Sequence, residues 1–332
     1  MTLDPRALAA EAGTSGFALE PLEKAARLLE LTDALWRHPF LADRLALKGG
    51  TALNLFVFDL PRLSVDIDLN YIGAADRATM MAERPKVEQA IQAVCGRLGL
   101  AVRRVPSDHA GGKWRLGFSS VIGATGTLEL DVNFLLRTPL WPPSVADSRA
   151  IAGVMAAAVP VLEIHELAAG KLAALFDRAA ARDLFDARNL MRTAGLDRER
   201  LRAALLVYGG MSRRDWREVS LDVVRLAPGE VDRTLTPVLR AGVAPERGEV
   251  PAWTARLVSE CRELLEFLLP LRTNELEFLT RLNERGQITG GLLTDDARLQ
   301  SVIELHPGLL WKALNVRRHR GLEAGDGVDA GD

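Results

Sequence analysis

Residues 45–69 read LALKGGTALNLFVFDLPRLSVDIDL and decide the fold of the surrounding chain. The apolar start predicts a short strand at 45–47, and the Gly49-Gly50 pair predicts a turn after it. Thr51 can cap a helix that runs to about residue 58. After a proline-containing loop, the alternating run SVDIDL predicts a second strand that ends near residue 73.

The second strand carries two carboxylates on one face. Alternate side chains of a strand point to opposite faces, which predicts a polar face of Ser64, Asp66, Asp68 and Asn70 and a buried face of Val65, Ile67, Leu69 and Tyr71. Two carboxylates this close repel by about 4 kcal/mol at an effective dielectric constant near 20. A cation between them removes that repulsion, so the pair suggests a hard metal ion such as Mg²⁺.

The turn Lys48-Gly49-Gly50-Thr51 joins a strand to the start of a helix. Glycines let the backbone approach a ligand closely, and the first amides of a helix attract anions. The turn is therefore a candidate phosphate site, although it lacks the GK[ST] ending of a P-loop. The alternative is an ordinary strand-to-helix turn with a capping threonine.

A third acidic segment is GTLELDVNF at residues 126–134. Alternation places Glu129, Asp131 and Asn133 on one face, and either Glu129 or Asp131 can join the first two aspartates. Three carboxylates can hold two Mg²⁺ ions, which clamp the attacking and leaving oxygens of a phosphoryl transfer. The alternative is a strand whose acidic face borders solvent.

Residues 165–190 form an alanine-rich segment with helical period. Lys171, Arg178 and Arg182 fall on one stripe if the helix is continuous, and Asp183 and Asp186 are neighbours at i, i+3. Beside a triphosphate, Lys171 would neutralise charge and Asp183 would fix a base, a ribose or a basic residue. Taken alone, the stripe is typical of a solvated helix face, and His165 is expected to start the helix.

The order of elements predicts an α+β fold. Helices are expected at 19–36 and 83–98, and strands at 100–105, 113–119 and 127–136 of a mixed sheet. After a proline-rich linker at 137–143 and an extended segment at 161–164, about eight helices follow. We therefore expect a bilobed molecule with a lobe around the mixed sheet at 1–145, an all-helical lobe at 146–320 and a disordered tail at 321–332.

The composition of the chain excludes few classes of function. The 332 residues are 48% hydrophobic, and their net charge of −2 gives no argument for nucleic acid. Without its acidic tail, the chain has a small positive net charge. Basic clusters at 103–104, 213–217 and 317–320 could contact phosphates. Two distant cysteines, Cys95 and Cys261, fit a reducing cytoplasm. Early acidic residues argue against a signal peptide, and no apolar stretch is long enough to span a membrane.

Taken together, these motifs resemble the AbiEii/AbiGii nucleotidyltransferase toxins, which include the MenT toxins, within the DNA polymerase β-like superfamily. The resemblance rests on KGGTALNLF with RLSVDIDL, on LELDVNF, on KLAALFDRAAARDLFDARNL and on the late segment HPGLLWKALN, and it covers about residues 19–315. Thr in place of the usual Ser, and the fourteen residues between Thr51 and Asp66, depart from the more compact superfamily pattern.

The resemblance implies that residues 1–145 form a nucleotidyltransferase lobe and that the helical lobe at 146–320 lines its active-site cleft. It also implies roles for individual residues. Asp66 and Asp68 would ligate metal, Asp131 would complete the site and help to deprotonate the acceptor, and Glu129 is the alternative. Lys171 would bind the triphosphate and Asp183 would organise the nucleotide. The remaining nucleotide-binding candidates are Lys48, Gly49, Gly50, Thr51, Arg62 and Arg182.

The resemblance also implies an activity: Mg²⁺-dependent transfer of NMP from an NTP to an acceptor hydroxyl, with release of pyrophosphate. The implied acceptor is the 3′ end of tRNA, and an antitoxin protein is the implied partner. Three alternatives are a small-molecule nucleotidyltransferase, a protein nucleotidyltransferase and a non-catalytic nucleotide-binding module.

Overall fold

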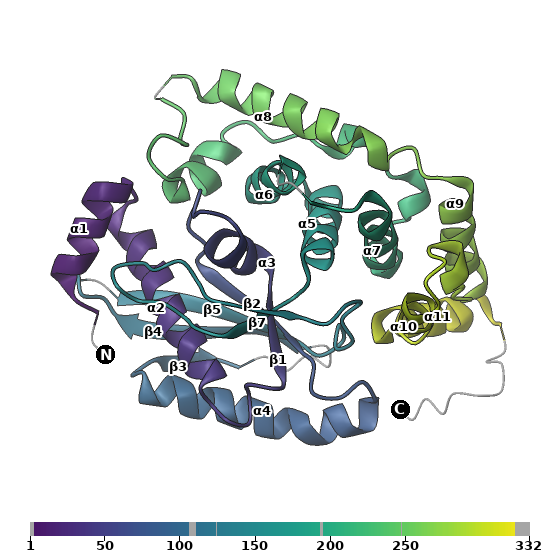
Figure 1. The fold of residues 1–332 in the computed structure, drawn as a ribbon, viewed down its shortest axis with the longest axis horizontal. Helices are drawn as coiled ribbons and strands as arrows, with labels where there is room; N and C mark the ends of the chain where they lie inside the picture. The colour runs from purple at the N-terminus through teal and green to yellow at the C-terminus, as the bar shows by residue number, and fades with distance from the viewer. Residues whose placement is uncertain (1–2, 106–110, 124, 193–194, 247, 323–332) are drawn as a thin grey trace.

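The computed structural model describes residues 3–105, 111–123, 125–192, 195–246 and 248–322. Its centre is one mixed sheet of seven strands in the order β3-β4-β5-β2-β1-β7-β6 (Figure 1). The central strand β2 is antiparallel to β1 and parallel to β5. The strands are β1 Leu45–Lys48, β2 Asp66–Tyr71, β3 Ala101–Arg104, β4 Gly111–Ser119, β5 Thr125–Asn133, β6 Ser144–Ala146 and β7 Val159–Val161.

The apolar face of the sheet lies against α2 (Leu19–Trp36) and α4 (Arg77–Arg97). Ile67, Leu69 and Tyr71 are fully buried, as the alternation predicted. The hydroxyl of Tyr71 donates a 2.7 Å hydrogen bond to Glu83 of α4, which fixes this face toward α4. The predicted polar face is correct only at Asp66 and Asp68, which are partly exposed, because Ser64 and Asn70 at its two ends are buried.

Helix boundaries follow local capping. The helix at 19–36 is confirmed at both ends. The next helix begins at Arg77, six residues before the predicted start, because Asp76 caps it by accepting a 2.7 Å hydrogen bond from the Thr79 amide. An additional helix, α1 (Pro5–Ser15), was not predicted, although Asp4 caps it and proline occupies its first turn.

The second half of the chain is helical, which confirms the α+β architecture. Its seven α-helices in the described ranges, where about eight helices were expected, are joined by short 3₁₀ and π segments. They are α5 Ile164–Arg178, α6 Ala181–Arg192, α7 Arg198–Met211, α8 Val250–Leu265, α9 Thr273–Thr280, α10 Ala297–Glu304 and α11 Pro307–Arg320. The expected continuous stripe is wrong, because Ala179 adopts a left-handed conformation with φ of 50° and ends α5.

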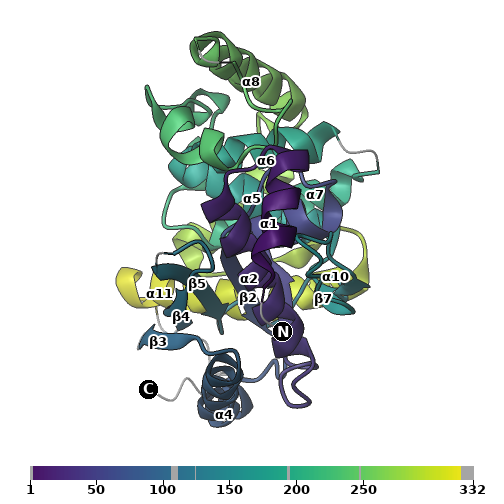
Figure 2. The same cartoon turned by 90° about the vertical axis from the view of Figure 1, so that its left-hand side faces the viewer.

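The layers are visible in two views. In Figure 1, α5 and α6 lie on the opposite side of the sheet from α4, and α8 lies outside them. Figure 2 shows the same stacking from the side of α1 and α2. The sheet continues through β7, which pairs in parallel with β1. The division into lobes at residue 145 stays a prediction, and the tail beyond residue 322 lies outside the described residues.

No helix in the described part of the chain is long and apolar enough to cross a membrane. Both cysteines are buried and unbridged. Burial raises the pKa of Cys95 to about 11 and that of Cys261 to about 12, so neither thiol is activated near neutral pH.

A buried carboxyl, Glu166, ties the helical half to the linker before it. Its carboxylate accepts a 3.0 Å hydrogen bond from the Leu140 amide and another from the Tyr208 hydroxyl of α7. Burial outweighs these bonds and raises the pKa of Glu166 to about 7.

This pKa predicts a pH-dependent stability. Below pH 4.5 Glu166 is neutral in both states, and between pH 4.5 and about 7 it ionises in the unfolded chain first. The free energy of unfolding should therefore fall across this window and level off above it. Urea unfolding at each pH checks this: Glu166→Gln should remove the decline, whereas the exposed Glu218→Gln should keep it. An unchanged slope in Glu166→Gln contradicts the assignment.

Candidate active site

The sheet register brings the predicted acids together in two rows. Asp66 lies opposite Glu129, and Asp68 lies opposite Asp131, on the parallel pair β2 and β5. Hydrogen-bonded strands lie about 4.7–4.9 Å apart, so paired side chains are neighbours on the same face. Lys48 of β1 lies opposite Asp68, so the second row consists of Lys48, Asp68 and Asp131.

Glu129 and Asp131 differ in their partners. Lys113 Nζ lies 2.8 Å from Glu129 Oε2, and Arg115 Nε lies 3.4 Å from Glu129 Oε1. The hydrogen bond from Lys113 lowers the pKa of Glu129. By contrast, within the described ranges the Asp131 carboxylate has no hydrogen-bond or ion-pair partner, and burial raises its pKa. Asp131 is therefore the acid of β5 that still lacks a cation.

Asp66, like Asp131, is a partly buried carboxylate without a partner. Burial raises the pKa of Asp66, and the charges of Asp68 and Glu129 act in the same direction, although the charge of Lys113 opposes them. Neither Asp66 nor Asp68 has a side-chain partner among the residues described. Unpaired, partly buried carboxylates favour a proton or a bound cation.

The oxygen donors of Asp66, Asp68 and Asp131 match the ligand preference of a hard divalent cation. In the described structure, however, no three acidic, histidine or cysteine side chains converge closely enough to hold one ion. The register places Asp68 beside Asp131, and Asp66 lies on the same face of β2. The donor set thus fits such an ion by the type of its ligands.

The glycine turn passes directly over these acids. β1 ends at Lys48 and the helical turn α3 (Gly49–Thr51) follows, continued by a π segment, Ala52–Val57. Gly49 has φ of +73°, and a Cβ there would lie 2.2 Å from Asp68 Oδ2. A side chain at Gly49 is excluded by both conformation and space. The turn therefore needs glycine in order to approach the carboxylates.

Two side chains that were predicted to bind phosphate are already bonded to other groups of the protein. Thr51 is buried, and its hydroxyl donates to the Asp66 carbonyl oxygen, so it ties the turn to β2. Arg62 is 2% exposed, and its guanidinium makes two hydrogen bonds to Asp186, of 2.8 and 2.6 Å.

Lys171 lies in the same buried network. Its ammonium nitrogen is 2.9 Å from Asp183 Oδ1 and 3.1 Å from Asp186 Oδ2. Burial alone would lower the pKa of Lys171, but the two carboxylates outweigh it and raise the pKa. An ammonium group has three donors, so one remains after these two contacts.

Asp186 is the centre of this network. Besides Arg62 and Lys171, it accepts a 3.0 Å hydrogen bond from Asn54 Nδ2, and the same amide also bonds the Gly50 carbonyl at 2.9 Å. Burial would raise the pKa of Asp186, but Arg62 and Lys171 lower it to about 2. Asp186 thus connects the phosphate-type turn to α5 and α6.

Sequence reasoning missed the roles of Asp186 and Asn54. The i, i+3 spacing from Asp183 to Asp186 was visible, but it did not indicate that Asp186 is fully buried. A polar residue one helical turn after the glycines, such as Asn54, was the other available signal.

Among the predicted cations, Arg182, like Lys48, forms no ion pair with the residues described. Its Nε donates a 2.7 Å hydrogen bond to the Thr234 carbonyl, and it has no carboxylate partner within the described ranges. Burial lowers the pKa of Arg182, and the nearby charge of Arg62 lowers it further, although Asp66 is close enough to act in the opposite direction. A half-buried cation without a counterion favours a bound anion.

His165 starts a helix, as expected. It lies in the first turn of α5, its Nδ1 contacts Glu163 Oε1 at 2.8 Å, and its Nε2 accepts a 2.7 Å hydrogen bond from the Asp197 amide. Both ring nitrogens therefore serve structural contacts.

Comparison with known proteins identifies the class. Residues 33–270 match the family model described as "Nucleotidyl transferase AbiEii toxin, Type IV TA system", so the chain belongs to this family and is a nucleotidyltransferase toxin. The family implies an NTP substrate and an antitoxin partner. The fold is similar to that of MenT4, a nucleotidyltransferase toxin from Mycobacterium tuberculosis H37Rv, with a TM-score of 0.62 over 93% of this chain and 99% of that one, at 19% identity. No curated protein matches the sequence.

Proposed function

We propose that the chain transfers an NMP from an NTP to an acceptor hydroxyl at the 3′ end of tRNA, with Mg²⁺ as the metal. The observation that carries the transfer is the set of three unpaired carboxylates, Asp66, Asp68 and Asp131, beside the glycine turn. The tRNA acceptor rests on the family resemblance.

The glycine turn and the cations around it would bind the phosphates of the NTP. The backbone at Gly49 and Gly50 lies against the phosphates, with Lys48 beside them. Arg182 contributes a further cation that has no counterion among the described residues. Lys171 offers its third donor while Asp183 and Asp186 hold it, and Thr51 and Arg62 keep the turn in place.

In the reaction, the acceptor oxygen attacks the α-phosphorus, the bond from that phosphorus to the α–β bridging oxygen breaks, and pyrophosphate leaves. Asp131, whose carboxylate has no partner among the described residues, takes the proton of the acceptor hydroxyl. Asp66, Asp68 and Asp131 would hold the divalent ion, which supplies charge neutralisation at the phosphates. Positioning and electrostatics account for most of the catalysis.

Incubation of the protein with each α-labelled NTP, Mg²⁺ and total RNA tests the proposal. Label in a tRNA-sized band is the expected result, and Asp68→Asn should abolish it. Label in protein or in a small molecule would show that the acceptor is not tRNA. If no fraction is labelled, the proposed transfer itself is wrong. Substitution of Mn²⁺ or Ca²⁺ for Mg²⁺ tests the metal.

Substitutions at Glu129 and Asp131 distinguish the roles of the two acids of β5. Because Lys113 and Arg115 neutralise Glu129, Glu129→Gln should lower the rate of transfer less than about tenfold. Asp131→Asn should lower it about 100-fold or more, since it removes the proton acceptor. Single-turnover rates measure both, and the reverse order would exchange their roles.

A further inference from the structure

A pocket of about 460 Å³ with three arginines in its lining opens beside the candidate site, where α5 ends. Arg178, Arg214 and Arg225 line it, together with Asp177 and Glu230. Arg178 Nε contacts Asp183 Oδ2 at 2.6 Å, and Asp183 in turn holds Lys171. The pocket is therefore one ion pair away from the network at the glycine turn. Nothing in the proposed transfer uses it.

The two acids of this pocket already have partners. Asp177 accepts hydrogen bonds from Ser212 and Trp216, and Glu230 accepts one from the Ala181 amide. Arg214 bonds a backbone carbonyl, that of Phe176. Arg225 is exposed, and its guanidinium makes no hydrogen bond or ion pair to the residues described. The spare hydrogen-bond donors of the pocket thus belong to its arginines.

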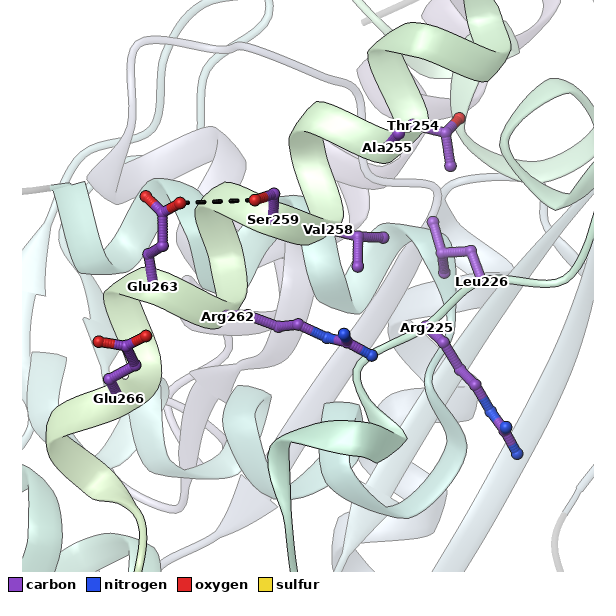
Figure 3. Close-up of a pocket in the computed structure, with 9 residues that line it drawn as sticks. All are labelled: Arg225, Leu226, Thr254, Ala255, Val258, Ser259, Arg262, Glu263 and Glu266. Carbon is purple, nitrogen blue, oxygen red and sulfur yellow. Dashed lines mark hydrogen bonds between the residues drawn. The ribbon is translucent and has the colours of Figure 1, made fainter.

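A second pocket, of about 550 Å³, continues from the first. Arg225 and Leu226 line both, and the second runs along α8. Figure 3 shows Arg262 pointing from α8 toward the segment that carries Arg225, with Val258 and Leu226 beside them. Arg262 Nε bonds the Val224 carbonyl, which leaves its other donors available. Glu263 and Glu266 lie at the other end of this pocket, away from Arg225.

We propose that Arg225, with Arg178 and Arg214, forms a phosphate-binding subsite for a single-stranded segment of nucleic acid. The subsite rests on the proposed function, because the strand it holds is that of the acceptor. Guanidinium groups bind phosphates through several donors at once. Leu226 lines both pockets and Val258 lines the second, so apolar surface for a base lies beside Arg225. Pockets of this volume admit ligands of one or two nucleotides, so an extended strand fits better than a duplex.

Binding of a fluorescent single-stranded RNA of about twelve nucleotides tests the subsite in the full-length chain, read as anisotropy at several salt concentrations. Arg225→Ala should weaken binding roughly tenfold and lower the slope of log affinity against log salt by about 0.7. Because the Arg225 side chain has no partner in the described structure, the melting temperature should not change. Arg214→Ala should act in the same direction.

The matched control is Arg97→Ala, an exposed arginine at the end of α4 on the opposite side of the sheet, and it should change RNA affinity less than twofold. The subsite is overturned if Arg225→Ala binds the RNA like the wild type, or if NTP affinity falls by the same factor. An equal loss for single-stranded and duplex RNA overturns the single-strand assignment.

The outcomes also separate this subsite from the proposed transfer. If the wild type labels tRNA and Arg225→Ala binds RNA normally, only the subsite fails. If RNA binding depends on Arg225 but no RNA is labelled, the subsite stands and the tRNA acceptor fails.

Discussion

Asp68→Asn should lower nucleotide transfer by at least about 1,000-fold, because the amide has nearly the same shape but no charge with which to hold a cation. Asp68 lies opposite Asp131 in the sheet and directly beneath Gly49, so it is the central carboxylate of the site. Single-turnover transfer from an α-labelled NTP gives the rate, and the melting temperature shows whether the fold is intact. Loss of a repulsive charge should leave that temperature unchanged or slightly raised.

The control for this variant is Asp43→Asn, an exposed carboxylate in the loop before β1, which should keep the wild-type rate. If Asp68→Asn transfers nucleotide within tenfold of the wild type, the metal role of the pair is wrong. A fall in rate together with a fall in melting temperature would indicate a structural role instead.

Asp186→Ala should reduce the free energy of unfolding by about 3–5 kcal/mol, the cost expected when one partner of a buried ion pair is removed. Arg62 would remain buried with its main counterion gone, and Lys171 would keep only Asp183. Urea unfolding measures the change. Asp232→Ala removes an exposed carboxylate and should change the free energy by less than about 0.5 kcal/mol.

A double-mutant cycle shows whether this cost arises from the pair. Arg62→Ala should be nearly as costly as Asp186→Ala, and the double variant should cost clearly less than the sum. Additive effects would show that the two residues act independently. A loss below about 1 kcal/mol in Asp186→Ala would mean that water or Asp183 compensates for the missing carboxylate.

Local rules of the chain predicted much of the fold. Helix 19–36 and the central strands followed from hydrophobic period and turn residues. The start of α4 was misplaced because the apolar period begins after the cap at Asp76. The left-handed break at Ala179 was missed, because alanine rarely adopts positive φ and gives no signal for a helix end.

The sequence by itself determined that Asp66 and Asp68 share a face with a third acid available, because the alternation of a strand is a property of the backbone alone. Tertiary structure decided which groups are paired. Cross-strand register leaves Asp131 without a partner and gives Lys113 to Glu129. The contact between Arg62 and Asp186 joins residues 124 positions apart, and no local pattern specifies such a pair. Burial and charge pairing depend on the packing of distant elements, so only the fold could distinguish carboxylates open to a ligand from those already neutralised.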